Sequence, residues 1–161
     1  MTTAAPHSYQ AWASTSPGGT AHVKLEAGGL DFDGSAFGNP TLPGPADLLA
    51  AALAACLSKN LERFSKILGF RYRWGRVTVG LERQDAPARI IRAPYLVEVT
   101  TDEPDERLQL LHRNLRKYGT ITNTLAAACE LSGELRRGFP EDRGESSGPP
   151  GGGVPMRPGH S

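Results

Sequence analysis

At 161 residues, the chain is long enough for one domain with a substantial core and short for two. Its 18 Lys and Arg nearly balance its 17 Asp and Glu, and the formal net charge of +1 favours neither nucleic acid nor a membrane as a partner. No apolar run approaches the roughly 18–20 residues that cross a bilayer, and the N-terminus lacks the basic start and apolar stretch of a secretory signal, so we expect a cytoplasmic protein.

Short strands are predicted at the N-terminus. Residues 8–14 and 21–32 have the composition of strands, and polar and apolar side chains alternate in the second segment. Paired glycines at 18–19 and 28–29 provide turns. Residues 33–44 are rich in Gly and Pro, which indicates a loop.

One long helix is predicted over residues 45–68. Pro45 suits the first turn, where its missing N–H would be unpaired anyway, and Asp47 lies where the helix dipole favours a negative charge. Gly69 follows the last periodic residue as a C-cap. The first half is almost entirely Ala and Leu, with no charge between Asp47 and Lys59, so this helix must be covered on all sides.

Strands and helices are predicted in the second half of the chain. Residues 71–84 and 89–101 alternate well and form a hairpin, in which Pro94 indicates an irregular or edge position. Thr101 or Asp102 is predicted to cap the next helix. The further elements are an amphipathic helix over 104–117, a short helix over 120–128, a strand over 129–136 and a disordered Gly/Pro-rich tail over 137–161, which leaves 1–136 as the folded domain.

This order of strands and helices indicates the α+β class. Only one long helix is available to cover the sheet, and the N-terminal strands carry little apolar area. A homodimer that packs two copies of the 45–68 helix together would bury both surfaces, so we expect a homodimer.

Cys56 lies three turns inside the long helix and has two interpretations. Free cysteine is among the most buried residue types, so it could be an inert core residue. The alternative is a nucleophile, which must be a thiolate; burial among Ala and Leu opposes that charge, and the helix dipole fades within about one turn. A nearby cation is therefore required, and the candidates are Lys59, His22, Lys24 or an arginine of a partner chain.

Other reactive residue types favour structural roles. His112 lies one turn from Leu108 on the apolar face of helix 104–117, which favours a hydrogen-bonded core or interface histidine over a general base. Cys129 opens the last predicted strand and is interpreted as a core residue. The four histidines show no ligand spacing such as HxxxH, so we expect neither a metal site nor another cofactor.

Three segments resemble the OsmC/Ohr family, named for osmotically inducible protein C and the organic hydroperoxide resistance proteins. Residues 45–56, PADLLAAALAAC, are similar to the family's proline-led helix with a cysteine at its far end. Residues 119–125, GTITNTL, resemble the segment of its second cysteine, and residues 18–24, GGTAHVK, its first glycine turn. The resemblance covers about residues 9–136 and implies an intertwined homodimer, with an antiparallel sheet wrapped around long central helices.

Well-studied members of that family reduce organic hydroperoxides with two cysteines, an arginine and a glutamate. Cys56 matches the attacking cysteine, whereas Gly119 stands at the position of the second. Thr20 replaces the arginine, and Ala46 replaces the glutamate, with Asp47 next to it. The resemblance therefore implies a one-cysteine thiol peroxidase for organic hydroperoxides. Cys56 would be the nucleophile, Asp47 an orienting carboxylate, and an external thiol would reduce the sulfenic acid.

The losses at these positions leave two other interpretations open. One is a non-catalytic dimer that binds a small hydrophobic ligand in its apolar pocket. The other is a purely structural dimer with no ligand. A reactive Cys56 thiol argues against the first, and a defined pocket beside Cys56 argues against the second.

Overall fold

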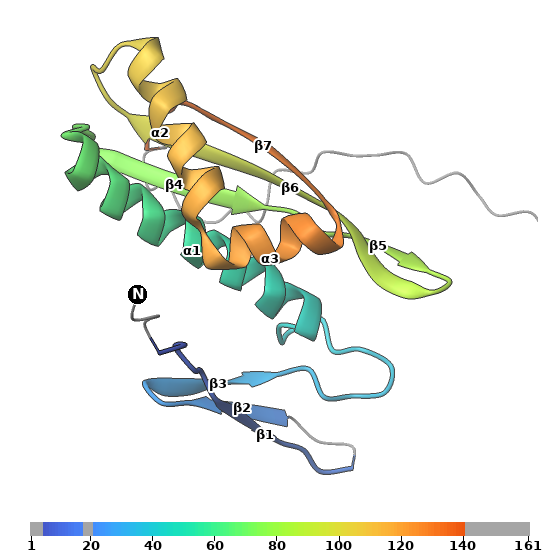
Figure 1. Ribbon diagram of the computed structural model, residues 1–161. Helices are drawn as coiled ribbons and strands as arrows, with labels where there is room; N and C mark the ends of the chain where they lie inside the picture. The colour runs from blue at the N-terminus through green and yellow to red at the C-terminus, as the bar shows by residue number, and fades with distance from the viewer. Residues whose placement is uncertain (1–4, 18–20, 141–161) are drawn as a thin grey trace, which may run out of the picture.

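The structure, a computed structural model, describes residues 5–17 and 21–140 (Figure 1). Thr20 and most of the predicted tail, from residue 141 onward, lie outside the described residues. The elements in chain order are β1 (Ala11–Ser14), β2 (Ala21–Leu25), β3 (Gly28–Phe32), α1 (Pro45–Leu68), β4 (Trp74–Val79), β5 (Glu82–Asp85), β6 (Ala88–Thr100), α2 (Asp105–Tyr118), α3 (Thr120–Ala128) and β7 (Glu130–Arg137). The α+β class is confirmed.

Helix α1 has the bounds that the sequence predicts. At its start, the Asp47 carboxylate accepts a hydrogen bond from the backbone N–H of Gly44 at 2.8 Å, which satisfies a donor that the helix itself leaves unpaired. At its end, Gly69 adopts a left-handed conformation with φ 62°, which glycine enters without the steric penalty of a side chain. These two local signals fix the length of the helix.

The larger sheet is built around β6. Strands β4 and β5 pair with successive parts of β6 in antiparallel fashion, with a register shift between Glu82 and Arg83. Pro94 lies where β6 passes from one partner to the other, as its predicted irregularity requires. Strand β7 joins β6 in parallel, because helices α2 and α3 carry the chain back across the sheet. The larger sheet is therefore antiparallel, as expected, except for the parallel pairing of β7 with β6.

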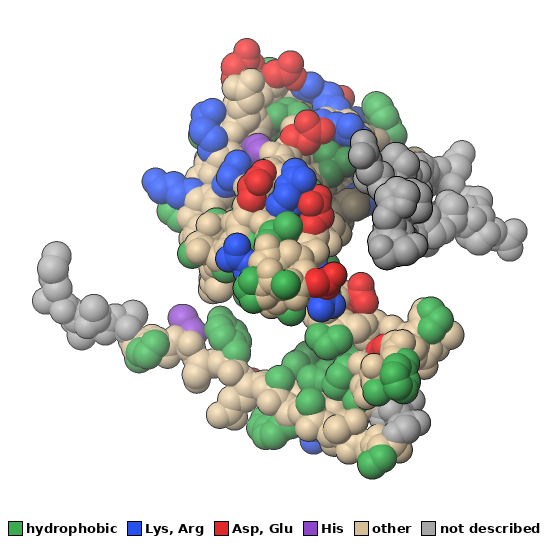
Figure 2. All heavy atoms as spheres, turned by 90° about the vertical axis from the view of Figure 1, so that its right-hand side faces the viewer, with side chains coloured by type: hydrophobic (Ala, Val, Ile, Leu, Met, Phe, Trp, Pro, Cys, Tyr) green, Lys and Arg blue, Asp and Glu red, His purple; other side chains and the backbone are tan. Residues whose placement is uncertain are grey.

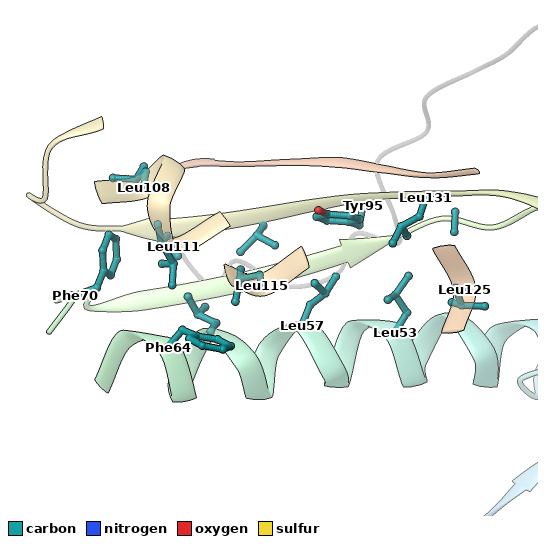
Figure 3. Close-up of a cluster of buried hydrophobic side chains, with 14 residues drawn as sticks. Leu53, Leu57, Phe64, Phe70, Tyr95, Leu108, Leu111, Leu115, Leu125 and Leu131 are labelled. Carbon is teal, nitrogen blue, oxygen red and sulfur yellow. The ribbon is translucent and has the colours of Figure 1, made fainter. Parts of the chain in front are cut away.

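The core fills the space between the larger sheet and the three helices (Figure 3). Leu53 and Leu57 of α1 point toward the sheet and have no exposed surface. Leu111 and Leu115 of α2 are equally buried and pack into the same cluster. This packing covers one face of α1 and leaves its opposite face open to other partners.

The small sheet β1–β2–β3 lies apart from this core on the other side of α1 (Figure 1). None of the clustered core side chains comes from it. Trp12 on β1 is 54% exposed, and Leu25 on β2 is 42% exposed. Figure 2 shows hydrophobic side chains gathered over the lobe that contains this sheet. One protomer therefore leaves apolar surface of the small sheet uncovered.

Several predicted boundaries differ from the observed ones. The predicted strand 21–32 is a hairpin of two strands, and the predicted strand 71–84 divides into β4 and β5. Helix α2 begins at Asp105 after Pro104, so the predicted caps Thr101 and Asp102 are wrong. Asp102 instead accepts a hydrogen bond from Arg73. Within the described residues, no helix is both long and apolar enough to cross a membrane.

Candidate thiol site

Cys56 lies half-buried on α1, at the edge of its buried face and beside α3. Its sulfur has two polar neighbours. The Asn60 amide nitrogen Nδ2 lies 4.0 Å from Cys56 Sγ, and the Thr122 hydroxyl Oγ1 lies 4.0 Å from the same sulfur. Both distances are at the outer limit for a hydrogen bond to sulfur. Both groups can donate a hydrogen bond to the sulfur.

Asn60 and Thr122 are held in place by their positions in the fold. Asn60 follows Cys56 by four residues, so the two side chains lie on the same face of α1. Thr122 belongs to the first turn of α3, which packs across α1. Asn60 is 7% exposed and Thr122 is 1% exposed. A buried polar side chain needs a partner, and the Cys56 sulfur is a partner for both.

Gly119 makes this arrangement possible. It joins α2 to α3 and is buried beneath Asn60 and Thr122. A Cβ atom at this position would lie 2.5 Å from Thr122 Oγ1 and 3.0 Å from Asn60 Nδ2. Any side chain here would therefore displace the two groups that face the Cys56 sulfur.

A cleft of about 430 Å³ opens beside Cys56. This volume lies within the range of small-molecule binding sites in proteins. Toward the start of α1, the lining is apolar and includes Ala52 and Ala55, with Ile121 of α3. Toward the end of α1, it is cationic and consists of Lys59 and Arg63, and the remaining lining residues are Tyr9, Asn60, Tyr118 and Thr120. The cleft therefore has an apolar half and a positively charged half, with the sulfur in it.

Lys59 and Arg63 have no acidic partner among residues 5–17 and 21–140, which the structure describes. The Arg63 guanidinium lies 5.4 Å from the centroid of the Phe64 ring, a cation–π arrangement. The Phe64 ring stacks in turn on Tyr118, with 5.4 Å between ring centroids. Of the cations that the sequence suggests for Cys56, the structure therefore places Lys59 in the cleft.

The other suggested residues are not brought to Cys56. His22 Nδ1 lies 2.8 Å from the Asp31 carboxylate on the small sheet, and Lys24 is on the same strand. Asp47 is nine residues before Cys56, about 13 Å along the helix axis, and caps the helix start. Neither His22 nor Asp47 lines the cleft.

Cys129 ends α3 instead of opening the last strand. Its thiol donates to the backbone carbonyl of Leu125 at 3.3 Å and packs against the core. It does not line the cleft of Cys56. The interpretation of Cys129 as a core residue fits this position.

His112 forms the hydrogen bond that its position on the apolar face predicts. The Tyr95 hydroxyl and His112 Nε2 are 2.8 Å apart. Burial lowers the pKa of His112, and the nearby charge of Arg116 lowers it further, while Glu134 acts in the opposite direction. Burial also raises the pKa of Tyr95. Both groups are therefore neutral near pH 7 and outside the thiol site.

A second cleft of about 500 Å³ lies beyond the far end of α1. Its lining is charged, but the charges pair with one another. Arg73 donates to Asp102, and the backbone N–H of Arg71 donates to Glu103 at 3.0 Å. The acidic groups are thus already satisfied, which makes this cleft a weaker candidate for chemistry than the Cys56 cleft.

Sequence reasoning missed Asn60, Thr122 and Arg63. Asn60 is the fourth residue after Cys56, and a polar side chain within an apolar stripe was the available signal. Arg63 is seven residues after Cys56, which also places it on the same face. Thr122 is 66 residues away, and no local pattern could connect it to Cys56.

The family model described as OsmC-like protein matches residues 38–133. None of the curated proteins searched is similar enough to match the chain. Among solved structures, an OsmC-like protein from Mycoplasma pneumoniae is 15% identical, with a TM-score of 0.72 over 82% of this chain and 96% of that one.

Two further solved structures bear names that concern hydroperoxides. The organic hydroperoxide resistance protein OhrB of Bacillus subtilis is 20% identical, with a TM-score of 0.60 over 81% of this chain and 98% of that chain. The organic hydroperoxide resistance protein OsmC from Legionella pneumophila is 16% identical, with a TM-score of 0.66 over 82% and 98%. At these identities, the structural similarity concerns the fold.

Proposed function

The chain belongs to the OsmC-like protein family, and on that premise we propose that it is a one-cysteine thiol peroxidase that reduces organic hydroperoxides. The observation that carries the proposal is the environment of Cys56. Its sulfur faces two buried polar side chains, Asn60 and Thr122, and opens into a cleft whose cations, Lys59 and Arg63, have no acidic partner among the described residues. An inert core cysteine requires neither feature. A cytoplasmic location, where thiols stay reduced, is part of the proposal.

The first step is an attack of the Cys56 thiolate on the terminal oxygen of a hydroperoxide, ROOH. The S–O bond forms as the O–O bond breaks, and the alkoxide leaves and takes up a proton to become ROH. The sulfur is oxidised by two electrons to a sulfenic acid, and the peroxide is reduced by the same two electrons. Asn60 and Thr122 stabilise the thiolate before the attack.

Lys59 supplies positive charge near the sulfur. It follows Cys56 by three residues, so both side chains are on one face of α1 and line the same cleft. A cation close to a thiol favours the thiolate, which is the nucleophilic form. In this proposal, Lys59 supplies the positive charge that an arginine supplies in well-studied family members and that Thr20 lacks.

An external thiol completes the cycle. Gly119 provides no sulfur at the second position, and the Cys129 thiol is directed to the carbonyl of Leu125. An incoming thiol displaces water from the sulfenic acid and forms a mixed disulfide with Cys56. A second thiol then releases the Cys56 thiolate and leaves as the small disulfide.

The proposed assembly is a homodimer. The uncovered apolar surface of β1–β3 is what a second copy would bury. Asp47 is too far along its own helix to touch Cys56 of the same protomer. The proposed role of Asp47 as an orienting carboxylate therefore requires a thiol of the other protomer.

The test is hydroperoxide consumption by purified protein with an excess of dithiothreitol. We expect wild-type protein and Cys129→Ala to consume cumene hydroperoxide at equal rates, well above the rate with dithiothreitol alone. Cys56→Ser should fall to that background. Equal consumption by Cys56→Ser and wild-type protein would disprove the proposal.

The alternative is a non-catalytic dimer that binds a small hydrophobic ligand. The apolar half of the cleft, with Ala52, Ala55 and Ile121, favours it. This alternative predicts that an apolar dye such as ANS binds equally well to wild-type protein and Cys56→Ser, with no turnover of peroxide by either. Replacement of Ala55 by a bulky, charged residue such as Glu should then abolish dye binding.

A further inference from the structure

We propose that Lys59 and Arg63 form a carboxylate-binding subsite that selects the reducing thiol, so that the reductant of Cys56 is a small thiol with a carboxylate group. This inference rests on the proposed function, because it concerns how the oxidised Cys56 is reduced. The second substrate, which reduces the oxidised Cys56, would be an anionic small thiol.

The division of the cleft into two halves is the first reason. Ala52 lies about 6 Å before Cys56 along the helix axis, and Arg63 lies about 10 Å after it. An organic hydroperoxide carries its apolar group most favourably over Ala52 and Ala55. The cationic half, with Lys59 and Arg63, is then free for a reactant of different chemistry.

The unpaired charges are the second reason. Among the described residues, no carboxylate pairs with Lys59 or Arg63, whereas the neighbouring Lys66 of the same helix is 2.7 Å from Glu62. Arg63 is steadied by its contact with Phe64, whose ring stacks on Tyr118. Two cations one helical turn apart can hold a single carboxylate between them, with charge-assisted hydrogen bonds from both.

The missing second sulfur is the third reason. The cleft contains no thiol except that of Cys56 among its lining residues, and Gly119 has no side chain to supply one. The reductant therefore has to come from solution and bring its sulfur to Cys56 Sγ. A carboxylate held at Lys59 and Arg63 would orient such a small thiol along α1 with its sulfur toward Cys56.

The reaction is a thiol–disulfide exchange that can be measured without any peroxide. Cys129→Ala protein is treated with methyl methanethiosulfonate, which converts Cys56 to its methyl disulfide. An incoming thiolate attacks the Cys56 sulfur of this disulfide, a new S–S bond forms as the old one breaks, and methanethiolate leaves. A second thiolate then attacks the incoming sulfur, which releases the Cys56 thiolate and a small disulfide. Failure of the peroxidase proposal would leave this measurement intact, so the two proposals can fail separately.

The experiment compares 3-mercaptopropionate, which is anionic, with 2-mercaptoethanol, which is neutral, and cysteamine, which is cationic. Each rate is divided by the rate of the same thiol on a short peptide with the same methyl disulfide, which removes intrinsic thiol reactivity. We expect the normalised rate to favour 3-mercaptopropionate over 2-mercaptoethanol by about five- to tenfold, the range for two exposed ion pairs. Cysteamine should be slowest, and the preference should shrink in high salt.

Lys59→Gln and Arg63→Gln should each reduce the preference, and the double variant should remove it. Using the ratio of rates cancels any change in the Cys56 thiol itself. Arg113→Gln is the matched control, because it removes one exposed positive charge from α2 outside the cleft, and it should keep the wild-type preference. Equal normalised rates for the three thiols, or a preference that survives the double variant, would overturn the proposal.

One further comparison separates the reductant from the peroxide. Oxidation of Cys56 by linoleic acid hydroperoxide is compared with oxidation by its methyl ester, in wild-type protein and in the double variant. We expect the ratio of the two rates to be the same in both proteins. If the charges of Lys59 and Arg63 affect only this ratio and leave the thiol preference unchanged, the subsite serves the peroxide and the proposal is wrong.

Discussion

The hydroxyl of Thr122 lies 4.0 Å from the sulfur of Cys56, although 66 residues separate the two along the chain. The contact joins α3 to α1 and brings a wholly buried hydroxyl to a half-buried thiol. Asn60 completes the arrangement from one turn further along α1. The polar environment of the sulfur is thus a product of tertiary packing.

Asn60→Ala and Thr122→Val should each slow the alkylation of Cys56 by iodoacetamide at pH 7. Each change removes a hydrogen-bond donor that favours the thiolate, and we expect a loss of about threefold to tenfold, the effect of one hydrogen bond to a charged group at long distance. The rate is measured in Cys129→Ala protein. Thr124→Val is the control, since its hydroxyl donates to Thr120 on the outside of α3. Unchanged rates in both test variants would show that the contacts are only structural.

Gly119→Ala should destabilise the fold and slow alkylation of Cys56 together. The added methyl group would lie 2.5 Å from Thr122 Oγ1, so Thr122 must move. Overpacking of this kind costs about 1–3 kcal/mol in the free energy of unfolding, which urea denaturation measures. Gly80→Ala is the control, because its methyl group would meet Pro94 Cγ at 3.4 Å. A Gly119→Ala protein as stable and as reactive as wild type would contradict the assigned geometry.

Asp47 has a structural task and a proposed chemical one, and two substitutions separate them. Asp47→Ala removes the cap at Gly44 and should cost about 1 kcal/mol in the free energy of unfolding. Asp47→Asn keeps an oxygen that can accept from Gly44 but removes the charge, so it should be nearly as stable as wild type. If Asp47 orients the thiolate of the other protomer, Asp47→Asn should still lower the rate of peroxide reduction. If Asp47→Asn reduces peroxide as fast as wild type, the only role of Asp47 is to cap the helix.

His112 should make the protein less stable in mild acid. Its pKa in the folded protein is lowered below 6.5 by burial and by Arg116, so the unfolded chain binds the proton more readily than the folded one. Its stability contribution is therefore fully present above about pH 6.5 and is lost as the pH falls through the folded-state pKa. His112→Gln should reduce the loss of unfolding free energy between pH 7.5 and pH 5.5, as measured by urea denaturation. Parallel pH profiles for the variant and wild type would contradict this assignment.

The homodimer predicts a mass in solution of twice the 17.2 kDa of one chain, which light scattering measures. Trp12→Lys is the test variant, because Trp12 is 54% exposed in the protomer and lies outside the core cluster. It should shift the mass toward that of one chain while the urea midpoint of the protomer core changes little. A wild-type mass of one chain at micromolar concentration would rule out the stable dimer.

Local signals account for what the sequence predicts well. Pro45, Asp47 and Gly69 are read directly as the start and end of α1, and the observed bounds agree. Such signals depend on neighbours in the chain and need no knowledge of the fold.

The sequence-based predictions that differ from the structure concern interactions between distant segments of the chain. The parallel pairing of β7 with β6 depends on how α2 and α3 return the chain, which no local pattern specifies. The cap of α2 was misplaced because Asp102 pairs with Arg73, which directly precedes β4. Likewise, Arg63 lines the cleft beside Cys56, but the sequence analysis did not identify it as a candidate cation.

The most direct test of the account is the product of one turnover at Cys56. Cys129→Ala protein, fully reduced and free of added thiol, is mixed with one equivalent of cumene hydroperoxide and then with dimedone, and its peptides are analysed by mass spectrometry. The account predicts a dimedone adduct on the peptide that contains Cys56 and one equivalent of cumyl alcohol. Recovery of unmodified Cys56 with the hydroperoxide intact would contradict it and leave the ligand-binding dimer as the better interpretation.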